Sequence, residues 1–122
     1  MYYDEIGIPT RQISAENPTG EKGAACRWEP NPADPDLPFS GGSMHLGKGW
    51  KVRPFIKVAP HETVVLMDVQ GSGSIREIFL TTDHRRLSEL VLRLYWDGED
   101  TPSVECPAGA FFAMGHDDAH HA

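Results

Sequence analysis

The sequence predicts an all-β fold, an antiparallel β-sandwich of the jelly-roll type. The 122 residues are about the size of one domain. The 12 Gly and 10 Pro residues interrupt the chain often, which disfavours long helices. Short runs rich in β-branched and aromatic residues are separated by turn signals, with no helical pattern between them. We therefore expect one domain over residues 1–122, a single jelly roll that is complete or incomplete.

The N-terminal part of the chain is expected to be mostly loop. Residues 10–17 (TRQISAEN) fit a short strand, and from about residue 18 to residue 50 the chain is rich in Gly, Pro, Asp and Ser. A connection of this length is uncommon in a compact domain unless it has a function. We interpret it as a functional or interface loop, or as a partly disordered segment.

Three strands are expected next. Residues 50–58 alternate roughly between apolar and polar side chains, and Pro54 suits an edge strand or a bulge. Residues 60–69 and 74–82 are rich in β-branched residues and flank the turn signal Gly71–Gly73. These two segments form the clearest predicted hairpin.

The C-terminal part completes the predicted sheet. Residues 88–96 alternate in the period of a strand and run into the tight-turn signal of Asp97 and Gly98. A last strand and a loop are expected within residues 102–115, followed by a polar tail at 116–122. Five or six strands leave sheet edges that partner subunits would need to cover.

Composition excludes some function classes. The net charge of −7, from 18 acidic and 11 basic residues, would repel a phosphate backbone, so nucleic acid is not an expected partner. No run approaches the roughly 18 apolar residues of a membrane span. The first residues lack the features of a signal peptide, so we expect a cytoplasmic protein, or a secreted one if the N-terminus is truncated. Cys26 and Cys106 are expected to be free thiols.

Four segments resemble the amino-terminal part of the family formerly called domain of unknown function 2961 (DUF2961), now glycoside hydrolase family 172. They are ISAENPTGEKG (13–23), LGKGWKVRPFIKV (46–58), DVQGSGSIREIFLTT (68–82) and LRLYWDGEDTPSVECPAGAFFAMGH (92–116). The resemblance implies jelly rolls, trimeric or hexameric assembly, and activity on fructofuranosides and arabinofuranosides. It also implies that the two catalytic glutamates lie beyond the part of the family that this chain resembles. Whether the chain is an enzyme therefore stays open.

Six residues are candidates for binding a sugar, and none is a candidate for catalysis. They are Glu16, Asn17, Trp50, Trp96, Asp97 and His116. The carboxylates of Glu16 and Asp97 suit contacts with sugar hydroxyls, although Asp97 can instead form a turn and Glu16 can bond locally. Trp50 and Trp96 suit stacking on a sugar ring, although burial in a core is the commoner role of a strand tryptophan.

No cofactor or metal is expected. The tail residues His116, Asp117, Asp118, His120 and His121 have the composition of a divalent-metal site. A flexible tail loses entropy for each ligand that it orders, so we expect a solvated terminus. The basic residues Lys22, Lys48, Lys51 and Arg53 suit an anionic sugar, an acidic neighbouring subunit, or simple solvation.

These observations lead to a first hypothesis and two alternatives. The first is a carbohydrate-recognising domain that binds a furanose-containing carbohydrate as a homo-oligomer, a trimer, a hexamer or larger. The second is a self-assembling structural protein that forms a filament or shell through strand addition or loop exchange. The third is a catalytically dead remnant that still folds.

Overall fold

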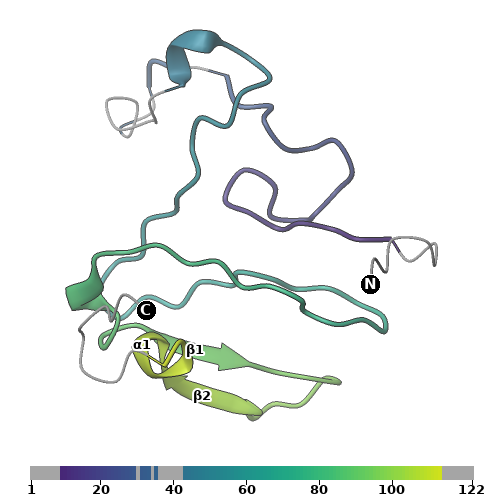
Figure 1. The fold of residues 1–122 in the computed structure, drawn as a ribbon, viewed down its shortest axis with the longest axis vertical. Helices are drawn as coiled ribbons and strands as arrows, with labels where there is room; N and C mark the ends of the chain where they lie inside the picture. Colours follow the sequence, from purple (N-terminus) through teal and green to yellow (C-terminus); the bar gives the residue numbers. More distant parts are fainter. Residues whose placement is uncertain (1–8, 30, 34, 36–42, 114–122) are drawn as a thin grey trace. The chain divides into compact units, whose positions relative to one another are not determined.

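The computed structural model describes residues 9–29, 31–33, 35 and 43–113 (Figure 1). The chain divides into two compact units, Met1–Ser72 (unit 1) and Gly73–Ala122 (unit 2). Each unit has its own local packing, and each is described by itself.

Unit 1 is built from turns. Its described part contains one short 3-10 helix, η2 (Met44–Leu46), and an isolated bridge between Ser14 and Asn17. In this bridge the two residues exchange backbone hydrogen bonds of 3.0 and 2.9 Å. Val52 is fully buried. A single buried apolar side chain is a small core, so hydrogen bonds carry much of the local order here.

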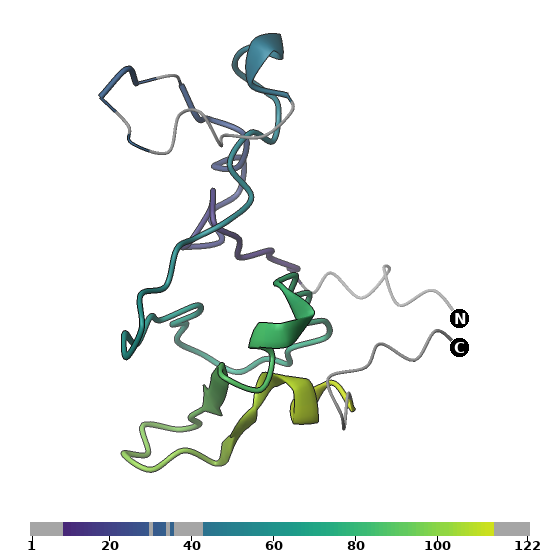
Figure 2. The ribbon, with the colours of Figure 1, turned by 90° about the vertical axis from the view of Figure 1, so that its left-hand side faces the viewer.

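Unit 2 contains the regular structure of the described chain. A 3-10 helix, η3 (His84–Arg86), precedes an antiparallel hairpin of β1 (Val91–Leu94) and β2 (Val104–Pro107). The helix α1 (Ala108–Phe111) follows β2 directly and lies beside the hairpin (Figures 1 and 2). The register places Val91 opposite Pro107 and Leu94 opposite Val104.

The start of α1 is fastened to the turn that follows η3. The N–H of Ala108 donates to the carbonyl of Leu90 at 2.7 Å, and the N–H of Gly109 donates to the carbonyl of Leu87 at 3.1 Å. These two bonds satisfy donors that the first turn of a helix leaves unpaired. Leu87 and Ala108 are both buried, so the apolar packing of unit 2 gathers at the same place.

The jelly-roll prediction is wrong. The described residues form one two-stranded antiparallel sheet, one four-residue helix and 3-10 turns, which is too little for a sandwich. The segments 10–17, 50–58, 60–69 and 74–82, predicted as strands, form none. Strand propensity largely reflects packing against neighbouring strands. Here Val65 remains 78% exposed and Phe79 84% exposed, so that packing is missing.

The last two predicted strands are confirmed in shortened form. β1 lies within the predicted segment 88–96, and β2 lies within 102–115. Arg93 and Glu105 sit directly opposite each other across the ladder, and the Arg93 Nε donates to Glu105 Oε2 at 2.5 Å. Opposite charges that face each other across two strands stabilise the pairing of those strands. The Arg93–Glu105 pair therefore favours the same register as the alternation of apolar and polar residues.

Candidate functional site

Glu16 is held by two backbone amides from a distant part of unit 1. Its Oε1 accepts a hydrogen bond from the N–H of Val52 at 2.9 Å and another from the N–H of Arg53 at 2.6 Å. We call this pair of bonds the Glu16 clasp. Bonds from neutral amides to a carboxylate are charge-assisted and therefore stronger than bonds between neutral groups. The clasp joins the start of the long loop to the segment that begins at Lys51.

The turn that carries Glu16 is itself ordered by Asn17. The Asn17 side chain is buried, and its Nδ2 donates to the carbonyl of Glu21 at 3.0 Å. The N–H of Gly20 donates to the Asn17 carbonyl at 3.2 Å. Gly20 has φ +66°, in the left-handed region that favours glycine. These bonds fix the backbone on which the Glu16 carboxylate stands.

The second oxygen of Glu16, Oε2, takes no part in the clasp. Oε2 accepts no hydrogen bond from the part of the chain that the structure describes, while Oε1 takes both clasp bonds. A carboxylate has about four lone-pair sites. Glu16 is thus fixed in position and retains acceptor capacity.

Glu16 lines an open groove within unit 1, with a volume of about 510 Å³. We call it the Glu16 groove. Six polar, charged and aromatic residues contribute to its wall: Glu16, Arg27, Trp28, Arg53, Phe55 and Lys57. The guanidinium carbon of Arg53 lies 5.7 Å from the centre of the Phe55 ring, a cation–π distance. Trp28 and Phe55 are half-buried, so each keeps part of its ring accessible.

The other predicted site residues of unit 1 lie elsewhere. Trp50 is 54% exposed and does not line the Glu16 groove. Asn17 is taken up by the turn described above, and its Oδ1 is buried without a hydrogen-bond partner among the described residues. A role for either residue in sugar binding stays a prediction.

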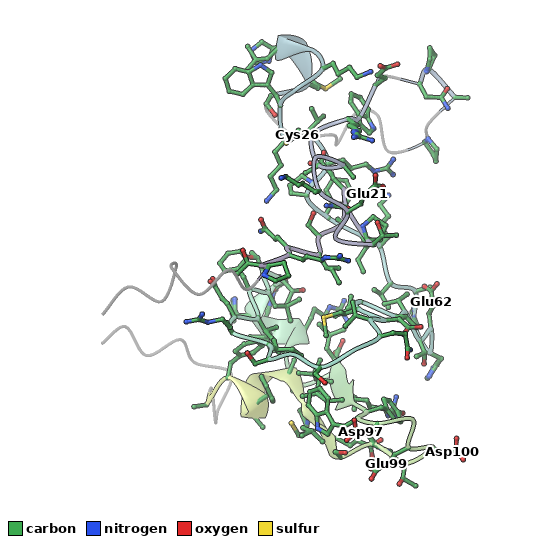
Figure 3. The ribbon with its side chains drawn as sticks, turned by 90° about the vertical axis from the view of Figure 1, so that its right-hand side faces the viewer. Glu21, Cys26, Glu62, Asp97, Glu99 and Asp100 are labelled. Atoms are coloured by element: carbon green, nitrogen blue, oxygen red, sulfur yellow. The ribbon has the colours of Figure 1, made fainter. Side chains whose placement is uncertain are left out.

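Asp97 forms a tight turn at the tip of the hairpin of unit 2. Asp97 has φ 51° and Gly98 has φ 75°, and the N–H of Glu99 donates to the carbonyl of Trp96 at 2.9 Å. Two successive positive φ angles are the mark of a type I′ turn. Asp97, Glu99 and Asp100 cluster at this tip (Figure 3). Binding of sugar by Asp97 stays a prediction.

Neither of the two candidate tryptophans is a core residue. Trp50 is 54% exposed and Trp96 is 44% exposed. The alternative that these tryptophans are buried in a core is therefore wrong. Both rings are partly exposed, and their stacking on a sugar stays a prediction. His116 and the rest of the tail lie outside the described residues.

Several charged residues of the described chain form ion pairs at the surface. Lys48, for which the sequence left an anionic sugar, a neighbouring subunit and solvation open, pairs at the surface with Glu29, and this hydrogen bond lowers the pKa of the Glu29 carboxyl. Asp83 accepts from Arg85 at the start of η3, and the Arg85 side chain is the main reason that the pKa of Asp83 is lowered. Exposed pairs of this kind contribute little to stability.

In the described ranges, no group of three or more His, Cys, Asp or Glu side chains is arranged to hold a metal ion. Nor does any helix in those ranges have the length and apolar character needed to cross a membrane.

The sequence did not indicate four residues of the groove, namely Arg27, Trp28, Phe55 and Lys57. Trp28 stands in a long loop rich in Gly and Pro, and an aromatic residue there has no strand or helix to pack into. A tryptophan outside every predicted strand was therefore the one feature of the sequence that could have indicated this groove. The contact between Glu16 and Val52 spans 36 residues, and no local pattern predicts it.

Comparison with known proteins places the chain in a family. Neither the curated proteins nor the solved structures provide a match. A family model described as GH172 domain-like matches residues 51–121, which is more than half of the chain. The match covers the hairpin and the groove residues Arg53, Phe55 and Lys57, and it identifies a glycoside-hydrolase-related domain. The resemblance found in the sequence is thereby confirmed, and the chain belongs to glycoside hydrolase family 172.

Proposed function

We propose that this chain recognises a furanose-containing carbohydrate in the Glu16 groove. The observation that carries the proposal is a fixed carboxylate beside two half-buried aromatic rings, Trp28 and Phe55. Sugars present apolar C–H faces that pack on aromatic rings, and hydroxyls that donate to carboxylates. The family relation supports a sugar as ligand, and the resemblance to furanoside-active enzymes supports the furanose class.

Recognition is a better proposal than hydrolysis for this groove. Glycoside hydrolysis uses two carboxyl groups, about 5 to 5.5 Å apart for retention or about 6.5 to 9.5 Å for inversion. Glu16 is the one carboxylate among the described residues that line the groove. Its Oε1 is also committed to the clasp. Hydrolysis would therefore need a second carboxylate beside Glu16.

The test is an NMR titration of the purified chain with short arabinofuranosyl and fructofuranosyl oligosaccharides. Binding in the groove is expected to shift the indole N–H signal of Trp28. The variant Phe55→Ala should weaken binding by about five- to tenfold, from the loss of roughly 1 kcal/mol of ring contact. Phe79→Ala is the matched control, since Phe79 is exposed in unit 2 and outside the groove.

Two results would count against this proposal. Saturating sugar that moves no signal from the groove residues would exclude carbohydrate binding there. Equal losses in Phe55→Ala and Phe79→Ala would show that binding does not depend on the groove. Hydrolysis of the oligosaccharide by the chain alone would refute the restriction to recognition.

Self-association is a second candidate function, favoured by a separate observation. Large apolar side chains stay exposed in both units, among them Val65 and Phe79, and β1 and β2 pair only with each other in the described chain. Exposed apolar patches and open strand edges are features of assembly surfaces. Light scattering with electron microscopy tests this candidate. A discrete trimer or hexamer fits a family-like assembly, open filaments fit a structural role, and a stable monomer contradicts both.

A further inference from the structure

We propose that Glu29 and Lys48 are positioning residues for the Glu16 groove, and that their ion pair sets the affinity for an uncharged sugar by holding Trp28. This inference rests on the proposed function and adds a means by which the same site is regulated. Neither Glu29 nor Lys48 lines the groove, so both act through Trp28, which does. The affinity for a ligand without charge therefore depends on the salt concentration.

Trp28 lies in a segment that is attached on both sides to another part of unit 1. Before Trp28, the carbonyl of Cys26 accepts a hydrogen bond from the N–H of Gly49 at 3.0 Å. After Trp28, the Oε1 of Glu29 accepts a hydrogen bond from the Nζ of Lys48 at 2.5 Å. We call these two contacts the Trp28 tether. Because they lie close to Trp28 on both sides, they restrict the backbone from which its indole ring reaches the groove.

The segment that makes the tether also makes the Glu16 clasp. The tether uses residues 48 and 49, and the clasp uses the amides of Val52 and Arg53. One short stretch, residues 48–53, therefore holds both the Glu16 carboxylate and the segment that carries the Trp28 ring. Two of the proposed sugar contacts are thus fixed against the same stretch of backbone, and the distance between them depends on both sets of bonds.

The ion pair is the part of the tether that salt can weaken. The side chains of Lys48 and Glu29 are 63% and 64% exposed, so ions of the solvent reach them. Screening weakens the attraction between exposed charges, although a pair of this kind changes an equilibrium by only a small factor. The backbone bond from Gly49 to Cys26 joins neutral groups and stays in place. Loss of the pair should therefore loosen Trp28 and leave the clasp intact.

The experiment is an NMR titration of the chain with a neutral arabinofuranosyl trisaccharide at about 50 mM and at about 500 mM sodium chloride. The affinity of the wild-type chain should fall about two- to fourfold at the higher salt concentration, because the pair that holds Trp28 is screened. The trisaccharide has no charge of its own to be screened. A salt dependence of its affinity therefore reports on charges within the protein.

Variants assign the effect to the pair. Glu29→Gln and Lys48→Gln should each lower the affinity about two- to fourfold at low salt and remove the salt dependence. The charge reversal that combines Glu29→Lys with Lys48→Glu restores a pair of opposite charges, and it should restore both the affinity and the salt dependence. Glu89→Gln is the matched control and should bind as the wild type does, since Glu89 forms an exposed pair with Arg86 at 2.6 Å in unit 2.

Hydrogen exchange separates a positioning role from a general loss of structure. In Glu29→Gln the amides of Val52 and Arg53 should exchange at the wild-type rates, because Glu16 still accepts hydrogen bonds from both. Faster exchange of these amides together with weaker binding would show that unit 1 opens, and this result would overturn the positioning role.

Failure of this inference and failure of the proposed function give different results. Sugar binding with an affinity that neither salt nor the two single variants change would overturn the inference and leave carbohydrate recognition standing. A salt dependence that persists in both Glu29→Gln and Lys48→Gln would also overturn it. The absence of binding at both salt concentrations would overturn the proposed function, and this inference with it.

Discussion

Removal of the Glu16 carboxylate should open the backbone at Val52 and Arg53. In Glu16→Ala both amides lose their acceptor. A hydrogen bond to a charged group contributes about 1.5 to 3 kcal/mol, and the lower figure suits a half-buried carboxylate, which gives about 3 kcal/mol for the two bonds. At about 1.4 kcal/mol per factor of ten, amide exchange at these two positions should accelerate by about 150-fold.

Hydrogen exchange followed by NMR measures this effect at the two amides directly. Glu16→Gln keeps a neutral acceptor of the same shape, so it should lose about 1 kcal/mol and speed exchange by about fivefold. Glu21→Ala is the control, because the bond that Glu21 accepts from Asn17 uses its backbone carbonyl. Exchange at Val52 and Arg53 that is unchanged in Glu16→Ala would refute the clasp.

Three further predictions concern turns and a helix cap. Gly20→Ala should destabilise the chain by about 1 to 3 kcal/mol in urea unfolding, because φ is +66° and the new Cβ would lie 3.1 Å from Ile13 Cγ1. Gly98→Ala should cost only about 1 kcal/mol in the same assay, since its φ is +75° but the space around it is open; a larger loss than in Gly20→Ala would contradict the steric argument. The pKa of Asp83 is lowered in the folded chain, chiefly by Arg85, so its contribution to stability is present above the ordinary value of 3.8 and is lost as pH falls through the folded value. The amide signal of Arg85 should therefore titrate with a midpoint below 3.8, whereas a midpoint at or above 3.8 would contradict this, and Asp83→Asn should abolish the titration.

The hairpin was predictable because its signals are local. Alternation over residues 88–96 and the Asp97–Gly98 pair act within a few residues, and the cross-strand pairing of Arg93 with Glu105 reinforces the same register. Segments 60–69 and 74–82 carry equally strong propensity but form no strands. Propensity gives a strand only where neighbouring strands cover its side chains, and the sequence does not show whether that cover exists.

The helix α1 and the Glu16 clasp were not predictable for a related reason. Residues Ala108–Phe111 are too few to show a helical period, and the start of the helix depends on the carbonyls of Leu87 and Leu90. The segment around Glu16 was singled out by family resemblance, which indicated its importance without indicating its partners. Contacts across 36 residues are set by the fold and leave no spacing signal.

The division of the groove between two parts of the sequence bears on specificity. The part of the chain before residue 51 contributes Glu16, Arg27 and Trp28 to the groove. The segment matched by the family model, residues 51–121, contributes Arg53, Phe55 and Lys57. The clasp is the link between these parts, because the carboxylate comes from the first and both amides come from the second. Under the proposed function, a change at Arg27 or Trp28 would alter contacts with the sugar and leave the clasp bonds in place. A change at Glu16 would alter the contacts with the sugar and also remove the clasp bonds. If the groove binds sugar as proposed, its ligand preference should therefore vary with the loop that carries Arg27 and Trp28, while Glu16 is constrained by the clasp as well as by the sugar.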